Sequence, residues 1–133
     1  MAVNLILETS FFIDLERERR RSEPGSAHEF LDRHSEDRFY LTFTIAGELA
    51  AGASLADRDA WASFLAPFHV LPSTLDVCWQ YGRTYRHLER NGILIGTNDL
   101  WIGATGLAYG MAVVTANLEH FRRIPELEVV GHR

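Results

Sequence analysis

The stretch LILETSFFID, Leu5 to Asp14, decides the fold of this 133-residue chain. Its three apolar residues Leu5-Ile6-Leu7 predict a short strand that is buried on both faces, as at the centre of a parallel sheet. Glu8 follows at once, and Thr9 or Ser10 is suited to cap the helix that comes next. A carboxylate at the end of a buried strand costs free energy unless something compensates it. The sequence therefore raises the question of which group offsets the cost of placing the Glu8 carboxylate there.

The bulk composition fits one soluble domain spanning residues 1–133, with a hydrophobic fraction of 47 % and a charged fraction of 23 %. The single cysteine, Cys78, excludes an internal disulfide and a cysteine-rich zinc site, and its apolar helical surroundings predict a core position. No secretory signal is visible at the start, and no apolar run approaches the roughly 20 residues of a membrane span. We therefore expect no membrane association and a cytoplasmic location.

The formal charge is −5, from 18 acidic against 13 basic residues. This balance argues against strong non-specific binding to nucleic acid, which depends on neutralising phosphates. It does not exclude a nucleic-acid enzyme whose acids hold metal ions, because bound ions reverse the local charge.

Short apolar strands and amphipathic helices alternate along the whole chain, without an internal repeat. The predicted strands cover residues 5–7, 38–42, 69–71, 112–115 and 128–130. The predicted helices cover the segment that ends by 24–25 and residues 26–34, 44–52, 55–66, 74–90, 98–109 (capped by Asn98 or Asp99) and 118–121. This alternation predicts an α/β domain with a mostly parallel sheet and helices on both faces.

Three acids fall at or near the carboxyl ends of these strands, where open parallel sheets bind ligands. Glu8 ends the first strand, Glu48 lies early in the helix after the second, and Asp99 opens a later helix. Asn117, just beyond Val113-Val114-Thr115, is a fourth polar group at this edge. Converging carboxylates repel one another, and a Mg²⁺ or Mn²⁺ ion bound by such hard oxygen donors commonly neutralises this repulsion. A divalent ion would then compensate Glu8.

Each acid also has a structural interpretation. Asp99 alone fits a helix cap, and Glu48 alone fits a solvent-facing or helix-dipole residue. Asp14 lies inside the first helix, so we interpret it first as a dipole or ion-pair residue. The six histidines show no metal-ligand spacing, so we expect surface or structural roles for them. Glycine-rich phosphate loops and the G-x-S-x-G elbow are missing.

The ordered motifs resemble those of PIN-domain ribonucleases, especially the toxins of VapBC-type toxin–antitoxin pairs. The matching pieces are Leu5–Phe11, Thr44–Leu49, Ile95–Ala104, Val113–Phe121 and Ile124–Val129. Each piece alone is weak, but their order and spacing agree over essentially the whole chain.

The resemblance implies a three-layer α/β/α fold around a parallel sheet of about five strands. It implies metal-dependent endonuclease action on RNA, a homodimer, and a small antitoxin that blocks the site. Carried over, the family's acids fall on Glu8, Glu48 and Asp99, and its fourth position, acid or amide, falls on Asn117. Thr9 and Thr115 match hydroxyls that support the site.

Glu8 departs from the family pattern, which favours aspartate. The extra methylene matters because Mg²⁺ requires near-octahedral geometry at about 2.0–2.1 Å. A misplacement of about 1 Å can cost roughly a hundredfold in rate. Natural drift, a tuned-down toxin and an engineered change would look alike in one sequence.

The preferred hypothesis is RNA phosphodiester hydrolysis with Mg²⁺ or Mn²⁺, in which Arg17 or Arg19 could meet the RNA backbone. The main alternative is a PIN-fold module that binds RNA or a partner protein but cuts slowly or not at all. A phosphatase-like hydrolase of small phosphate esters is a weaker alternative. Apolar helix surface around Trp61, Phe64 and Trp79 predicts the homodimer. The sequence gives neither the RNA target nor the cut position.

Overall fold

The computed structural model describes residues 1–133 and contains five strands and seven α-helices. The strands are β1 (Asn4–Leu7), β2 (Arg38–Thr42), β3 (His69–Leu71), β4 (Ala112–Thr115) and β5 (Val129–Gly131). The helices are α1 (Thr9–Arg21), α2 (Ser26–Arg33), α3 (Phe43–Ala51), α4 (Arg58–Leu65), α5 (Leu75–Arg90), α6 (Thr97–Tyr109) and α7 (Leu118–Phe121), with a short 3₁₀ turn η1 (Ala53–Leu55).

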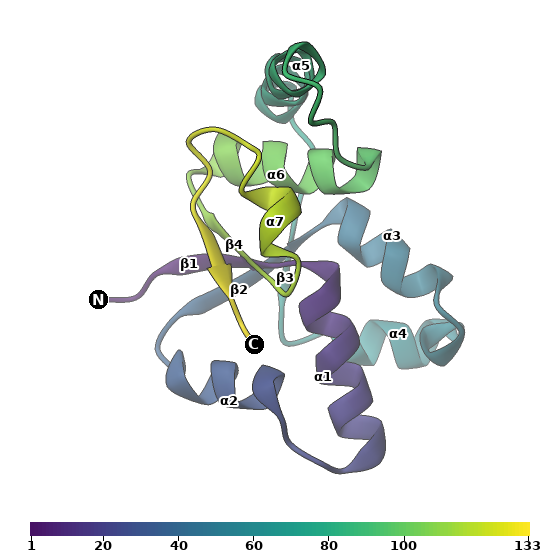
Figure 1. The fold of residues 1–133 in the computed structure, drawn as a ribbon. Helices are drawn as coiled ribbons and strands as arrows, with labels where there is room; N and C mark the ends of the chain where they lie inside the picture. Colours follow the sequence, from purple (N-terminus) through teal and green to yellow (C-terminus); the bar gives the residue numbers. More distant parts are fainter.

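All strand pairs are parallel, and the sheet order is β3-β2-β1-β4-β5. Figure 1 shows α1 and α2 on one side of the sheet and α5 and α6 on the other, which gives three layers. The predicted α/β/α fold with five parallel strands is therefore confirmed.

The order of the strands creates a switch point between β1 and β4. From β1 the chain builds outward through β2 and β3, and it then returns to add β4 and β5 on the other side of β1. Crossovers leave opposite faces of the sheet at such a point, so a crevice opens beyond the carboxyl ends of the two central strands. Leu7 pairs with Val114 there, which places Glu8 beside Thr115.

The core explains why β1 is so apolar. Ile6 and Leu7 have no exposed surface, and Phe11 and Phe12 of α1 are equally buried. A central parallel strand is covered by helices on both faces, so its side chains have no polar side to turn to.

Several predicted helix boundaries are wrong because the caps lie elsewhere. The helix predicted over residues 55–66 begins at Arg58, because the Asp57 carboxylate accepts a hydrogen bond from Ala60 N. The helix predicted to begin at Asn98 or Asp99 begins at Thr97, with Gly96 as its N-cap. Cys78, predicted in the core, is exposed on α5.

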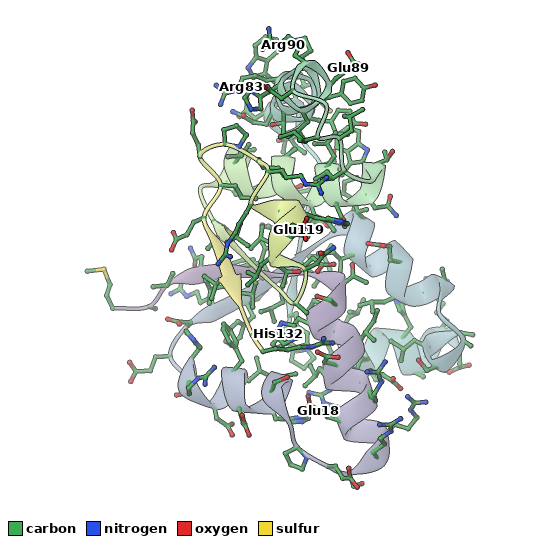
Figure 2. The ribbon with its side chains drawn as sticks, viewed as in Figure 1. Glu18, Arg83, Glu89, Arg90, Glu119 and His132 are labelled. Carbon is green, nitrogen blue, oxygen red and sulfur yellow. The ribbon has the colours of Figure 1, made fainter.

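An ion-pair cluster ties the last two residues to α1. The Asp14 carboxylate lies 2.8 Å from His132 Nε2, and the Arg133 guanidinium donates to both of its oxygens at 2.9 and 3.0 Å. Figure 2 shows His132 reaching α1 from the end of the chain. The interpretation of Asp14 as an ion-pair residue is confirmed, and His132 has a structural role.

None of the helices is both long and apolar enough to cross a membrane.

Candidate active site

The structure brings the four predicted site residues to the edge formed by the carboxyl ends of β1 and β4. Glu8 follows β1 directly, Glu48 lies on α3, Asp99 is in the first turn of α6, and Asn117 precedes α7. Burial raises the pKa of the Asp99 carboxyl, and the negative charges of Glu8 and Glu48 raise it further. Glu8 and Glu48 therefore both lie close enough to act on Asp99, although the three acids are far apart along the chain.

Glu8 is compensated by hydrogen bonds within the protein. Its carboxylate, in a residue only 5 % exposed, accepts from Ser10 N at 3.1 Å, from Ser10 Oγ at 2.8 Å and from Thr115 Oγ1 at 2.5 Å. The bond from Ser10 N makes Glu8 the N-cap of α1. The prediction that Thr9 or Ser10 caps this helix is therefore wrong, because the longer glutamate folds back over the first turn.

Hydroxyl groups hold the other parts of the edge in place. Thr9 Oγ1 donates to Glu48 Oε1 at 2.8 Å and so links α1 to α3. Thr115 Oγ1 accepts from Asn117 N at 2.9 Å, and Ser10 Oγ accepts from Ala116 N at the same distance. Thr9 and Thr115 thus stand beside the acids. Ser10 joins them as a residue for which the sequence suggested only a capping role.

His120 is a member of the site that sequence reasoning missed. Its Nδ1 lies 2.8 Å from Asn117 Nδ2 and 3.5 Å from Asp99 Oδ2. Hydrogen bonding and the charge of His120 act to lower the pKa of Asp99, but they do not outweigh burial and the acids. The available signal was its spacing, since the turn of α7 brings a residue three positions after Asn117 back towards it.

The oxygen atoms of the site residues are of the type that coordinates a hard divalent cation. Carboxylate and amide oxygens are the ligands that Mg²⁺ and Mn²⁺ prefer, and neither Glu8 nor Glu48 has an ion pair with a basic side chain. As the side chains lie, no three acids or histidines converge on one point that could hold an ion. Glu8 and Glu48 are directed towards hydroxyls instead, so ion binding requires at least one of these side chains to turn.

A cavity of about 120 Å³ opens beside Glu48, between α1 and α3. Its lining combines the polar residues Thr9, Glu16, Glu48 and Ser54 with the apolar residues Ile13, Leu49 and Leu55. A flat apolar group could therefore lie against the apolar residues while a polar group attached to it reaches the acids.

The two arginines suggested for RNA contact have protein partners. Arg17 Nη1 lies 3.6 Å from Asp14 Oδ1, and the Arg19 guanidinium lies 5.3 Å from the centre of the Phe64 ring. Neither arginine has a hydrogen bond or ion pair with Glu8, Glu48 or Asp99.

Comparison with known proteins identifies the family of this chain. The family model described as "PIN domain" matches residues 5–127. A protein of Rickettsia bellii named "Ribonuclease VapC" is 29 % identical, with 96 % of each chain covered. The structure of VapBC-1 from nontypeable Haemophilus influenzae superposes with a TM-score of 0.83 at 26 % identity, covering 98 % of each chain. The VapBC2 structure from Rickettsia felis, bound to a DNA fragment from its promoter, gives 0.84 at 23 % identity over 97 % of this chain and 98 % of that one, which is a likeness of fold.

Proposed function

This chain belongs to the PIN domain family, and from that premise we propose that it is an endoribonuclease that hydrolyses RNA phosphodiester bonds with the help of Mg²⁺ or Mn²⁺. The observation that carries the proposal is the gathering of Glu8, Glu48 and Asp99 at the switch point of the sheet, where the charges of both glutamates act on the half-buried Asp99. Relatives named ribonucleases over nearly the full length of the chain support it.

Each residue of the edge has a role in this proposal. Glu8, Glu48 and Asp99 would hold the ion directly or through water, and Asn117 would orient the attacking water. The ion, when bound, supplies positive charge that activates water and stabilises the leaving oxygen. Thr9 and Thr115 would keep Glu48 and Glu8 in position through the hydrogen bonds they already make.

We further propose that the protein is the toxin of a type II toxin–antitoxin pair, inhibited in the cytoplasm by a cognate antitoxin. The support is the fold shared with VapBC structures that cover nearly the whole chain, one of them at 26 % identity. A short neighbouring reading frame encoding a DNA-binding protein, whose product co-purifies with this chain and stops RNA cleavage, is the expected finding.

We also propose a homodimer, but fewer of the expected aromatic residues are available for its interface. Phe64 belongs to the core, and Trp61 is half-buried with its indole N–H donated to Ala46 O. Only Trp79, 62 % exposed, remains of the three aromatic residues expected there, and Leu75 lies one turn before it at 87 % exposed. Two large apolar side chains on one helix face favour burial against a second copy.

One observation favours the alternative of a weak or inactive RNA-binding module. Both oxygens of the Glu8 carboxylate are already engaged by Ser10 and Thr115, and the ion would have to compete with these donors. The longer side chain in place of the family's aspartate makes this inward conformation possible. The alternative predicts RNA binding without metal-dependent turnover.

The test compares RNA cleavage by the parent, Glu48→Gln and Glu36→Gln. Glu36 is exposed in the turn before β2, at the opposite edge of the sheet, so it supplies the same change away from the site. We expect cleavage in Mg²⁺ or Mn²⁺ that disappears in chelator and in Glu48→Gln but persists in Glu36→Gln. Binding without cleavage would favour the module, and turnover of a generic small phosphate ester in place of RNA would favour a phosphatase-like enzyme.

A further inference from the structure

A basic pocket lies away from the acids, between the last turns of α5 and the segment that leads into β5. Its volume is about 260 Å³, and it is lined by Arg83, Thr84, His87, Arg90, Pro125 and Glu126. Figure 2 shows Arg83 and Glu89 projecting to opposite sides of α5, so the acid of the last turn does not face Arg83. Three of the six lining residues, Arg83, His87 and Arg90, are therefore of basic type, and Glu126 is the one acid among them.

The helix dipole does not explain this arrangement. Cations in the last turn of a helix are favoured by the dipole, which accounts for Arg90. Arg83 lies about two turns earlier, where that effect has faded. Its spacing from His87 and Arg90, four and seven residues, places all three on one helix face. Arg90 has no ion pair, and the partner of Arg83 is Glu126, whose side chain is 72 % exposed. Such an exposed pair holds the guanidinium only weakly.

The opposite wall of the pocket is firmly fixed. Ile124 is almost fully buried against α6, where a Cβ on Gly103 would lie 2.2 Å from Ile124 Cδ1. The absence of a side chain at Gly103 therefore allows the segment to approach the helix closely. Glu126 has a left-handed backbone, with φ of 68°, and follows Pro125 in a turn, where a proline of fixed φ favours this conformation at the next residue. The pocket is consequently formed before any ligand binds.

One short segment connects the pocket to the acids. His120, near its start, lies 3.5 Å from Asp99 and contacts Asn117, and Pro125 and Glu126, at its end, line the pocket. Arg123 lies between them in the chain, and its guanidinium donates to Leu94 O in the loop before α6 and lies 3.5 Å from the exposed Glu119 carboxylate, a pair that holds it only weakly. An elongated anion could follow this segment from the acids past Arg123 to α5.

We propose that the pocket is a phosphate site for the RNA backbone, remote from the bond that is cut at the acids. This inference rests on the proposed ribonuclease function and names where the substrate is held. Guanidinium groups bind phosphate with two parallel hydrogen bonds. A chain with a net charge of −5 needs such a local basic site to hold an anionic substrate. Backbone contacts of this kind position RNA without reading its sequence.

The test measures binding of a fluorescein-labelled, mixed-sequence single-stranded RNA in chelator, over a salt series, for the parent and the double variant Arg83→Gln/Arg90→Gln. We expect affinity about tenfold lower at low salt and a log–log salt slope smaller by about 1.4, because two phosphate contacts are lost. The ratio of the parent's affinity to that of the double variant should therefore fall about sevenfold over a fourfold rise in salt concentration. In metal, KM for long RNA should rise, whereas cleavage of an oligonucleotide too short to reach the pocket should be unchanged.

Arg86→Gln is the matched control for Arg90→Gln. It removes the same charge from the same helix, but the Arg86 guanidinium lies 5.7 Å from the Trp79 ring centre and outside the pocket. Equal losses for the two single variants, or an unchanged salt slope in the double variant, would overturn the proposal. So would a parent that binds no RNA, or a double variant that escapes its antitoxin while binding RNA normally, since the pocket would then serve an acidic segment of the partner. RNA binding that weakens as expected in a protein that never cuts would leave the pocket in place and remove the proposed catalysis.

Discussion

Replacing Glu8 by glutamine separates its structural role from its proposed catalytic role. Glutamine has the same shape, so its amide oxygen can still accept from Ser10 N and cap α1. The NH2 group of the glutamine then replaces the oxygen that accepts from the Ser10 and Thr115 hydroxyls, and reversing the direction of these two hydrogen bonds costs about 1 kcal/mol. Removing the charge that repels Asp99 offsets part of this cost. We therefore expect the free energy of unfolding, measured in chelator, to change by no more than about 1 kcal/mol.

Metal binding and cleavage should respond far more strongly. A cation at a hundredfold excess over its dissociation constant stabilises the parent by about 2.7 kcal/mol. A neutral amide binds a hard cation poorly, so Glu8→Gln should lose most of this stabilisation. RNA cleavage should fall at least a hundredfold, which corresponds to about 2.7 kcal/mol of transition-state stabilisation.

Glu8→Asp is the informative companion. Aspartate also caps helices well, but it is shorter by one methylene and cannot fold back to Ser10 and Thr115 in the same way. Cleavage should be retained or increased. A gain of about a hundredfold would identify the parent as an attenuated nuclease with a displaced ion, and no gain would mean that the site has adapted to glutamate.

The assay is thermal unfolding with and without millimolar Mn²⁺ at neutral pH, together with cleavage of labelled RNA by the same preparations. If Glu8→Gln cuts RNA as fast as the parent and gains as much from Mn²⁺, Glu8 is not a ligand. The hydrogen bonds from Ser10 and Thr115 would then be its whole function.

Three other predictions follow from the charges and the surface. Burial and the charges of Glu8 and Glu48 raise the pKa of Asp99, so Asp99→Asn should stabilise the ion-free protein by about 1 kcal/mol in urea unfolding at neutral pH, and the gain should vanish below the ordinary value of 3.8. Burial alone would raise the pKa of Asp14, but hydrogen bonds from Arg133 and His132 lower it below the ordinary value of 3.8. Asp14→Asn should therefore lower the free energy of unfolding by about 2 kcal/mol at neutral pH in the same urea assay. The difference should disappear in acid, because the parent loses this stabilisation as the pH falls below 3.8. Light scattering should give twice 15.1 kDa for the parent and 15.1 kDa for Trp79→Glu; a monomeric parent at micromolar concentration would contradict the dimer.

The sequence by itself determined the elements and the place of the acids. The apolar run Leu5–Leu7 implied a central strand, and a carboxylate directly after it implied a group at the binding edge of the sheet. Both inferences depend on local patterns, since alternating strands and helices leave little choice of architecture. Glu48 and Asp99 could be assigned to the same edge because each was expected near the start of a helix that begins at the carboxyl ends of the strands.

Only the tertiary structure decided what each of these groups contacts. Glu8 meets Thr115 across 107 positions, and Asp14 meets His132 across 118, so no local pattern could reveal either pair. Cys78 was predicted in the core because its neighbours are apolar, yet it is exposed on α5. The prediction failed because the sequence does not show which face of the helix packs against the rest of the protein. The basic pocket likewise exists only because Gly103 lets the segment ending at Glu126 lie close to α6 and α5. Residues near in sequence form elements through local hydrogen bonds and periodicity, whereas contacts between elements depend on packing that one sequence does not display.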